Sequence, residues 1–420
     1  MSDMINEKEN EIIQDTWIEI DPTPSSDTPS DTPSDTHISD DMINWTDIDD
    51  INEDLLRGIY GYGFEKPSPI QQKSIKPFLN KNDLIAQAQS GTGKTGAFTV
   101  SSLQTIDVNK DYTQALIMSP TRELSVQIFN VLNNLGTHMS GLKTHLLVGG
   151  SSINGDMDAL RSNPHIVVGC PGRVHDMIRR SKLDASKLDL IVIDEADEML
   201  SSGFKDQVYN IFQFLKNNVQ ISLFSATLPS EVQELANKFM RNPKKILVKA
   251  EALTLEGIKQ YYVAVDNDTV KYDTLKDVYS CISVSQTIIY CNSIRRVEDL
   301  THAMLQDGFP VTCIHGKMSH EDRSKSFKDF KNGSTRVLIS TNLTSRGIDV
   351  QQVSTVINFD IPNDVHSYLH RIGRSGRWGR KGMGINFVSR YDIKMLKEIE
   401  EYYHTQIEEL PADIMKKSDI

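Results

Sequence analysis

The 420-residue sequence lacks the marks of a membrane or secreted protein. It contains no run of about 18 apolar residues, the length that a transmembrane helix requires. Its N-terminus is acidic and has no apolar segment of the kind found in secretory signal peptides. The four cysteines show no C-x-x-C spacing, which argues against zinc binding and disulfide bonds and fits a reducing compartment. We therefore expect a cytoplasmic protein, with the nucleus as the alternative, that does not bind membranes.

Positive charge is scarce as well, since the formal net charge is -12. Residues 1–50 carry fifteen Asp or Glu and one Lys, a net charge of -14, which leaves +2 for the other 370 residues. The body of the chain is therefore nearly neutral, and its basic residues gather late, as in "HRIGRSGRWGRKG" (370–382). The total charge does not argue against a nucleic-acid partner.

The N-terminal 44 residues are poor in apolar side chains and contain the repeat "SDTPSDTPSDT" (26–36). This composition is typical of disorder, and we expect a disordered acidic tail over 1–44. Its simplest role is to increase solubility. Phosphorylation at Thr28 and Thr32, each followed by proline, is an alternative that the sequence permits.

Short Val/Ile/Leu-rich runs alternate with longer amphipathic stretches from about residue 54 onward. Such runs are typical of buried parallel strands, and their alternation with helices indicates an α/β fold. The strands are expected at 83–88, 114–119, 144–149, 165–170, 188–194, 220–226 and 244–250, and in a second series at 258–265, 286–291, 310–316, 335–341, 354–360 and 384–389. We predict two tandem domains, 45–249 and 258–420, each an open parallel sheet flanked by helices, joined by a linker over 250–257.

Polar stretches of unusual composition stand where these predicted strands end. They read SGTGKT, SPTREL, GCPGR, DEAD, SAT, CNS, HGK and STNLTSRGID. Open α/β sheets bind ligands outside the carboxyl ends of their strands. The pattern therefore predicts one site that is built from both domains.

The stretch "AQSGTGKTG" (88–96) follows a predicted strand and precedes a predicted helix, as a phosphate-binding loop does. Gly91 and Gly93 would let backbone N–H groups approach phosphate oxygens. Lys94 would supply a positive charge, and Thr95 a hydroxyl ligand for Mg²⁺. Ala88 stands where the general pattern has glycine, so a simple glycine-rich turn is the alternative.

The stretch "LIVIDEAD" (190–197) favours the phosphate-binding interpretation. An apolar strand that ends in Asp194 is typical of a segment that holds Mg²⁺, partly through water. Glu195 could polarise the attacking water as a general base. Alone, this stretch could be a strand that runs into an acidic turn, but the two patterns in this order indicate a nucleotide site.

The ordered motifs resemble those of the DEAD-box RNA helicases over roughly 45–420. The matching stretches are "GFEKPSPIQ" (63–71), "PTREL" (120–124), the Gly149–Gly150 pair, "CPGR" (170–173), "DEAD" (194–197), "SAT" (225–227), "IIYCNS" (288–293), "STNLTSRGID" (340–349) and "HRIGRSGR" (370–377). Within the family, the chain is most similar to the minimal helicases of translation initiation and of the exon junction complex. The resemblance implies two RecA-like domains, ATP and Mg²⁺ as ligands, and tolerance of Ala88.

The resemblance also implies roles for individual residues. The residues expected to bind the nucleotide are Phe64, Gln71, Ala88, Gln89, Ser90, Gly91, Thr92, Gly93, Lys94, Thr95 and Asp349. Arg374 and Arg377 would be arginine fingers that act with Lys94, Asp194 and Glu195 in catalysis, and their spacing from Arg371 predicts that the three arginines share one helical face. Ser225, Thr227, Asp197 and His370 would couple the nucleotide to RNA. Phe64 could instead be a core residue, the SAT residues a polar strand end, and the arginines a basic surface.

RNA contacts are expected mostly to the backbone, and hence with little sequence specificity. By resemblance, the candidates are Pro120, Thr121, Arg122, Gly150, Arg173, Asn292, His315, Gly316 and Thr341. Four positions depart from the family pattern: Cys170 replaces Thr, Asn342 replaces Asp, Lys317 replaces Asp, and Trp45 stands about one residue away from the usual upstream aromatic of the adenine site. Each RNA candidate could also be a loop residue with a local structural role.

Three functions compete on these residues. The first is an RNA-stimulated ATPase that unwinds or remodels RNA, with translation initiation as the pathway that the resemblance suggests. The second is an ATP-gated RNA clamp that serves as an assembly platform with little unwinding. A P-loop kinase or GTPase would leave the second domain's motifs without a role. We expect a monomer with RNA and scaffold or initiation-factor proteins as its partners.

Overall fold

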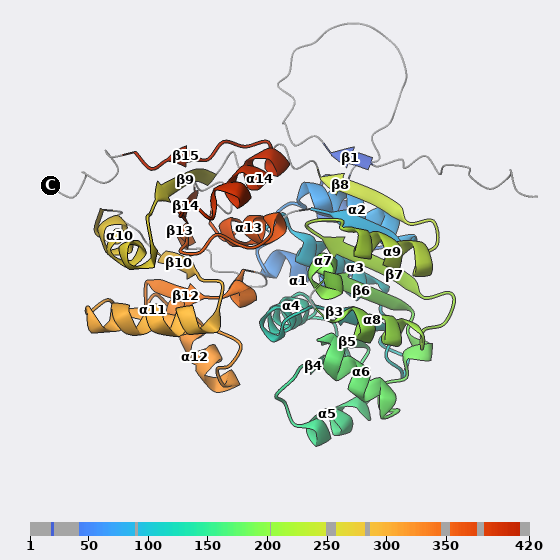
Figure 1. The fold of residues 1–420 in the computed structure, drawn as a ribbon. Helices are drawn as coiled ribbons and strands as arrows, with labels where there is room; N and C mark the ends of the chain where they lie inside the picture. The colour runs from blue at the N-terminus through green and yellow to red at the C-terminus, as the bar shows by residue number, and fades with distance from the viewer. Residues whose placement is uncertain are drawn as a thin grey trace, which may run out of the picture.

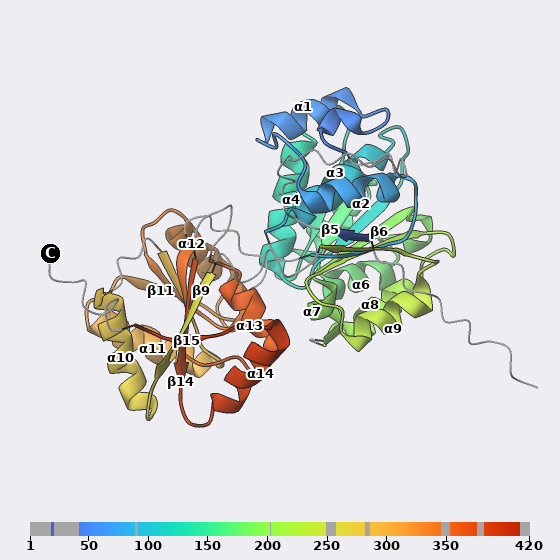
Figure 2. The same ribbon diagram turned by 90° about the horizontal axis from the view of Figure 1, so that it is seen from above.

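The computed structural model describes residues 18–20, 42–88, 91–201, 203–248, 258–281, 286–345, 353–375 and 382–411. These residues form two helix-flanked sheets, which Figures 1 and 2 show as two separate lobes. All strand pairs in both sheets are parallel. The predicted linker 250–257 lies outside the described residues, as do most of the residues of the predicted tail.

The first sheet has the strand order β1-β8-β2-β7-β6-β3-β5-β4. Its strands are β1 (Ile18–Ile20), β2 (Leu84–Gln87), β3 (Ala115–Met118), β4 (Thr144–Leu147), β5 (Ile166–Gly169), β6 (Leu190–Asp194), β7 (Gln220–Ser225) and β8 (Lys244–Val248). Alternate residues of one strand face opposite sides, so Leu84 and Ala86 pack in one core and Ile85 in the other. Both faces of the sheet are therefore covered.

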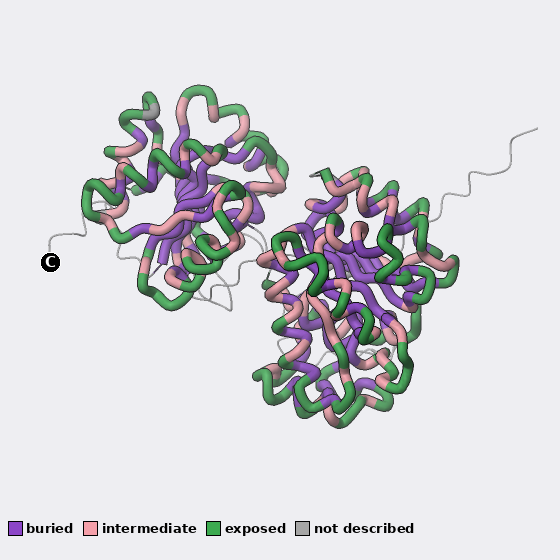
Figure 3. The backbone as a smooth tube through the Cα atoms, turned by 90° about the horizontal axis from the view of Figure 1, so that it is seen from below, coloured by how far each residue is buried: buried purple, intermediate pink, exposed green. Residues whose placement is uncertain are grey.

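Helices on both faces supply the rest of each core. The Leu84 side is covered by α1 (Glu53–Gly61), α2 (Pro69–Leu79), α3 (Lys94–Thr105) and α4 (Arg122–Leu135). The Ile85 side is covered by α6 (Pro171–Arg179), α7 (Ala196–Ser201), α8 (Lys205–Phe212) and α9 (Ser230–Phe239), while α5 (Ile153–Leu160) flanks β4. Burying each large aliphatic side chain stabilises the fold by about 1.5–3 kcal/mol. Figure 3 shows the buried strands inside each half.

The second sheet has the order β11-β12-β10-β13-β14-β9-β15. Its strands are β9 (Ile258–Ala264), β10 (Gln286–Tyr290), β11 (Val311–Ile314), β12 (Val337–Ser340), β13 (Val353–Asn358), β14 (Gly382–Val388) and β15 (Glu408–Glu409). One face packs against α10 (Asp268–Cys281) and α11 (Ile294–Gln306). The other packs against α12 (His320–Lys331), α13 (Val365–Ile372) and α14 (Ile393–Tyr403).

The structure confirms the two parallel α/β sheets and each strand that the sequence predicts. Two short edge strands, β1 and β15, are additional. β1 lies within the tail predicted over 1–44 and pairs with β8, with Ile18 opposite Ile246. Among the described residues, no helix is both long and apolar enough to cross a bilayer.

Candidate nucleotide and RNA site

The glycine-rich loop after β2 leads directly into helix α3. Gly93 precedes the first helical residue with a φ of 104°, and Gly91 has a φ of 88°. These backbone angles favour glycine, because a Cβ atom is strained there. Lys94 is only 5% exposed, and its Nζ makes no hydrogen bond to the described residues. A buried ammonium group in this position, at the N-terminus of a helix, fits a phosphate ligand.

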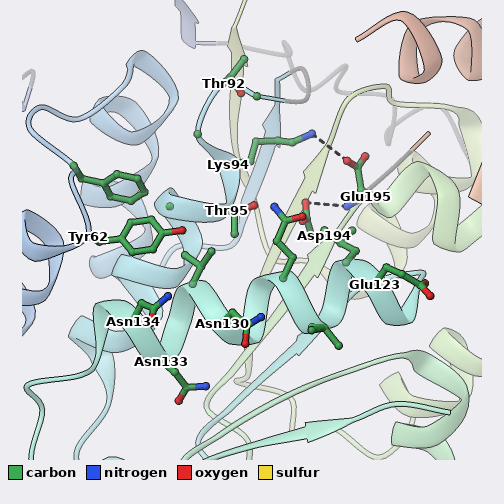
Figure 4. Close-up of a pocket in the computed structure, with 18 of the residues that line it drawn as sticks. Tyr62, Thr92, Lys94, Thr95, Glu123, Asn130, Asn133, Asn134, Asp194 and Glu195 are labelled. Carbon is green, nitrogen blue, oxygen red and sulfur yellow. Dashed lines mark hydrogen bonds and ion pairs between the residues drawn. The ribbon is translucent and has the colours of Figure 1, made fainter. Parts of the chain in front are cut away.

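Two buried carboxylates follow the end of β6. Asp194 Oδ1 accepts a hydrogen bond from the backbone N–H of Glu195 at 3.0 Å, and Glu195 Oε1 lies 4.0 Å from Lys94 Nζ. Burial raises the pKa of Asp194, the Glu195 carboxylate raises it further, and Lys94 opposes both effects. Glu195 has a φ of 51°, a strained conformation for a residue with a side chain. In this backbone conformation the side chain of Glu195 points toward Lys94 (Figure 4).

Gln71 is a buried residue of α2 that ties the loop to the segment before the helix. Its amide donates to the carbonyl of Gly93 at 3.1 Å, and its carbonyl accepts from the N–H of Ser68 at 2.7 Å. A Cβ atom at Gly93 would lie only 2.9 Å from the Gln71 amide nitrogen. The side chain therefore holds the loop in place, with one amide hydrogen left for a ligand.

Aromatic side chains line the approach to this loop. Tyr62 and Phe64 line the same cavity as Lys94, and their rings meet edge to face with centroids 5.0 Å apart. Trp45 is fully buried and stacks against Phe64 with centroids 6.0 Å apart. Trp45 therefore supports Phe64 from the core, and Tyr62 is the second aromatic of the cavity.

A buried polar chain connects the DEAD and SAT segments to the second sheet. The backbone N–H of Asp197 donates to Ser225 Oγ at 3.2 Å, and Thr227 Oγ1 donates to Asp197 Oδ2 at 2.7 Å. His370 Nε2, from α13, lies 3.4 Å from the same Asp197 oxygen. The predicted coupling residues are thus in contact, and their contact crosses between the two sheets.

A cavity of about 1330 Å³ is lined by four of the five predicted catalytic residues, and the fifth, Arg377, lies outside the described residues. Lys94, Thr95, Asp194 and Glu195 come from the first sheet and its loops, and Arg374 comes from the second. Figure 4 shows the first four of these side chains above helix α4, and Thr95 and Asp194 both line the cavity. Their hydroxyl and carboxylate oxygens are the ligand types that Mg²⁺ prefers. A divalent cation there would also favour the ionised form of Asp194.

The prediction that Arg371, Arg374 and Arg377 share one helical face is wrong for Arg371 and Arg374, the two that the structure describes. Helix α13 ends at Ile372, and the chain then turns, with Arg374 N–H bonded to the carbonyl of Arg371 at 3.1 Å. Arg371 points into the second sheet's own core, whereas Arg374 lines the cavity. Gly373 caps the helix, and this early end separates the directions of the two side chains.

Among the described residues, the groups that accept hydrogen bonds from Arg371 are all neutral. Its guanidinium donates to the side-chain oxygens of Asn342, Asn358 and Asn292 at 2.7, 3.1 and 2.7 Å. A fourth bond, at 2.7 Å, reaches the Asp360 carbonyl. Burial lowers the pKa of Arg371 to about 10. Arg371 therefore fixes the loops after β10, β12 and β13, and Asn342 is one of its direct partners.

The RNA candidates of the first sheet lie on neighbouring loops. Arg122 Nη1 donates to the carbonyl of Gly149 at 2.5 Å, and Thr121 caps α4. Arg173 donates to the side chain of Asp156 and to the carbonyl of Ser151. In this structure, Arg173 therefore orders the loop after β4. Pro120 is buried and Gly150 is exposed.

The RNA candidates of the second sheet differ in how many of their polar groups already form hydrogen bonds or ion pairs within the protein. Asn292 is fully engaged, because it accepts from Arg371 and donates to the Ile361 carbonyl at 2.7 Å. His315 is buried beside Glu298, at 3.5 Å. Gly316 is exposed and Thr341 caps the short helix η4 (Asn342–Thr344).

Two contacts between the sheets involve Arg323 and His320, which the sequence did not single out. Arg323 Nη1, on α12, lies 3.1 Å from Glu123 Oε1 on α4. The ring of His320 abuts Gly150 so closely that a Cβ atom there would lie 2.1 Å from it. Only packing between distant segments brings these residues together with their partners, and no local sequence signal marks Arg323 or His320.

Cys170, one of the departures from the family pattern, lies beside a serine hydroxyl group. Cys170 precedes α6 and its sulfur lies 3.4 Å from Ser125 Oγ. Burial raises the pKa of the Cys170 thiol to about 11.

Four predicted site residues, Gln89, Ser90, Asp349 and Arg377, lie outside the described residues.

The chain is similar to known proteins over most of its length. Residues 68–235 match the family model of the DEAD/DEAH box helicases, and 270–379 match that of the helicase conserved C-terminal domain. The chain is 52% identical to eukaryotic initiation factor 4A of Caenorhabditis elegans, over 89% of this chain and 93% of that protein. It is 51% identical to the ATP-dependent RNA helicase eIF4A of Aspergillus niger, over 89% and 94%. The structure of S. cerevisiae Dbp5 bound to RNA and ADP BeF3 is 33% identical, covers 88% of this chain and 98% of that one, and superposes with a TM-score of 0.81.

Proposed function

The chain belongs to the DEAD/DEAH box helicase family and is an ATP-dependent RNA helicase, and we propose that its hydrolytic centre is the cavity shared by the two sheets. The observation that carries this proposal is the position of Arg374, which lines the same cavity as Lys94, Asp194 and Glu195 although it comes from the other sheet. The activity of a site assembled from two lobes can depend on how the lobes are arranged. Hydrolysis would then respond to any ligand that brings them together.

ATP is the substrate that this site would hold. Lys94 would contact the phosphates together with the backbone N–H groups at the start of α3. Tyr62 and Phe64 would place an aromatic surface beside the base, and the remaining amide hydrogen of Gln71 could contact its edge. Thr95 and Asp194 would hold Mg²⁺, which neutralises phosphate charge when bound.

The chain's own residues supply the remaining chemistry. Glu195 would accept a proton from the attacking water, because its carboxylate lies in the cavity beside Lys94. Arg374 would stabilise the negative charge that develops on the transferred phosphoryl group. These two residues come from different sheets, so proton transfer and charge stabilisation are both available only when the sheets are together.

The contacts around Asp197 would transmit the arrangement of the lobes. Asp197 joins Ser225 and Thr227 within the first sheet to His370 of the second. Separation of the sheets would remove the His370 contact, one turn before Arg374. The chain thus provides a direct link between the DEAD segment and the segment that carries the arginine.

The two lobes are arranged as in a related structure that contains RNA, which supports the proposal that this protein adopts the same arrangement when it binds RNA. The TM-score of 0.81 to Dbp5 bound to RNA and ADP BeF3 extends over 88% of this chain, and thus over both sheets. Gly149, Gly150 and Gly316 are exposed, and Arg122 lies beside the Gly149–Gly150 turn. We propose that RNA backbone binds along these loops, that the protein acts as a cytoplasmic monomer, and that scaffold proteins of translation initiation are its partners.

An RNA clamp remains the second candidate. The contact between His320 and Gly150 and the ion pair of Arg323 with Glu123 would both prolong a closed complex. A clamp and a helicase use the same catalytic groups and differ in the lifetime of the RNA complex after hydrolysis. Phosphate release and RNA dissociation, measured in one stopped-flow experiment, would separate them.

The direct test is steady-state ATP hydrolysis with and without single-stranded RNA, for the protein and for Glu195→Gln. We expect RNA to stimulate hydrolysis and the variant to lose that stimulation while it still binds ATP. Hydrolysis that RNA does not change, in folded protein, would show that the cavity is not coupled to RNA. Undiminished hydrolysis in Glu195→Gln would remove Glu195 from the reaction.

A further inference from the structure

The contact between His320 and the Gly149–Gly150 turn is specific in its geometry. His320 is the first residue of α12, and its ring nitrogen Nε2 and carbon Cδ2 face Gly150 from the other sheet. Gly150 has a φ of 84°, so glycine is favoured both by the backbone and by the lack of space for a Cβ atom. The contact thus seats a turn that is expected to bind RNA.

The hydrogen bond at the other side of the ring determines its protonation state. Arg323 Nη2 lies 2.7 Å from His320 Nδ1. A guanidinium group can only donate, so Nδ1 must accept and cannot carry a proton. The ring in this contact is therefore the neutral imidazole with its hydrogen on Nε2.

The charged groups around the ring oppose its protonation. Arg323, on the same helix, and Arg122, at the start of α4, both face His320, and among the described residues Glu123 of α4 is the acidic group that acts on it. Glu123 is already paired with Arg323 at 3.1 Å. Burial and the two arginines lower the pKa of His320. A protonated ring would lose its bond to Arg323 and face two positive charges.

We propose that His320 is a positioning residue that seats the Gly149–Gly150 turn across the two lobes only as a neutral imidazole, and so makes closure on RNA sensitive to acid. This inference rests on the proposed function, because it concerns the same closed arrangement. When the lobes separate, His320 leaves Gly150 and Arg122, and its pKa returns toward the ordinary value of about 6.5.

The direction of the pH effect follows from linkage. The closed state has the lower pKa, so it binds fewer protons than the open state in the interval between the two values. Closure is therefore fully favourable above about pH 6.5 and weakens as the pH falls below it. One such group changes the closing equilibrium by at most about tenfold per pH unit.

The test compares the protein with His320→Gln between pH 5.5 and 8. Glutamine keeps an acceptor for Arg323 but does not titrate. Fluorescence anisotropy with labelled single-stranded RNA and a non-hydrolysable ATP analogue would give the Kd of each protein, and their ratio removes pH effects that both share. We expect the ratio of wild-type to variant Kd to be constant above pH 7 and to rise severalfold, up to about tenfold, by pH 5.5. A ratio that stays constant over the whole range would overturn the proposal.

A second measurement does not depend on how well the variant binds RNA. NMR titration of ring-labelled histidine would follow His320, identified by the resonance that His320→Gln lacks. Its pKa should be lower with RNA and the ATP analogue than without them; an equal or higher value would overturn the proposal. RNA-stimulated hydrolysis at pH 8 in both proteins would leave the proposed function intact in that case. If RNA stimulates neither protein, the proposed function is wrong, and the role of His320 is wrong with it.

Discussion

Replacement of Arg371 by methionine tests whether this residue is part of the scaffold or of the catalytic centre. The side chain is 1% exposed and donates four hydrogen bonds, to Asn342, Asn358, Asn292 and the Asp360 carbonyl. Methionine fills similar space but leaves these acceptors without their donor. An unsatisfied buried acceptor costs about 1–3 kcal/mol, and the removal of a buried guanidinium offsets part of the total for four acceptors, so we expect a net loss of roughly 3–5 kcal/mol.

This loss predicts a large shift in melting temperature. For a domain of 150–250 residues, each 1 kcal/mol lowers Tm by about 2–4 °C, so the second sheet should melt roughly 6–20 °C lower. Differential scanning calorimetry would resolve this transition. Arg371→Lys is the matched control, because it keeps the charge but not the four bonds. Its Tm should lie between those of the unaltered protein and Arg371→Met. An unchanged Tm together with lost hydrolysis would refute the structural role of Arg371 and make it a catalytic residue.

Three further predictions concern the coupling chain, a cysteine and the departure at Asn342. Thr227→Val removes the donor to Asp197 and should slow RNA-stimulated hydrolysis by roughly tenfold, the effect of about 1.4 kcal/mol; an unchanged rate would separate the SAT segment from coupling. The pKa of about 11 predicts that Cys170 is alkylated about 100-fold more slowly at pH 8 than in the unfolded chain, as mass spectrometry would measure, and equal rates would contradict the raised pKa. Asn342→Asp gives Arg371 an ionic partner and should raise Tm by roughly 2–4 °C, whereas a lower Tm would show that the neutral amide is preferred.

The sequence was sufficient for the parts of the fold that depend on local pattern. Buried parallel strands carry continuous apolar runs, and each predicted run is a strand of the structure, from Leu84–Gln87 to Gly382–Val388. The carboxyl ends of parallel strands share one edge of a sheet. The polar stretches after those strands, and with them Lys94 and Asp194, could therefore be placed together from the sequence.

The directions of individual side chains could not be predicted in this way. Arg371 and Arg374 belong to one basic stretch, yet the end of α13 at Ile372 turns one toward the core and the other toward the cavity. The partner of Arg173 is Asp156, in a different helix. Trp45 lies in the core because of the packing of the segment before α1, which no short motif encodes.

Contacts between the sheets were the least accessible to sequence reasoning. His320 and Gly150 are 170 positions apart, and their meeting depends on the arrangement of two separately folded sheets. Neither residue type indicates the other. A histidine at the start of an exposed helix is more simply explained as a surface residue, and only the structure gives it a partner.

The central claim is that hydrolysis requires a group from each sheet in one cavity. The most direct test is ATP hydrolysis by Arg374→Lys, with and without single-stranded RNA, beside its RNA affinity in the presence of a non-hydrolysable ATP analogue. Lysine keeps the charge but cannot present a planar pair of donors to the phosphoryl oxygens. We predict that RNA-stimulated hydrolysis falls by about a thousandfold while RNA affinity changes little. Stimulated hydrolysis within a few fold of the unaltered protein would contradict the claim and place the whole reaction in the first sheet.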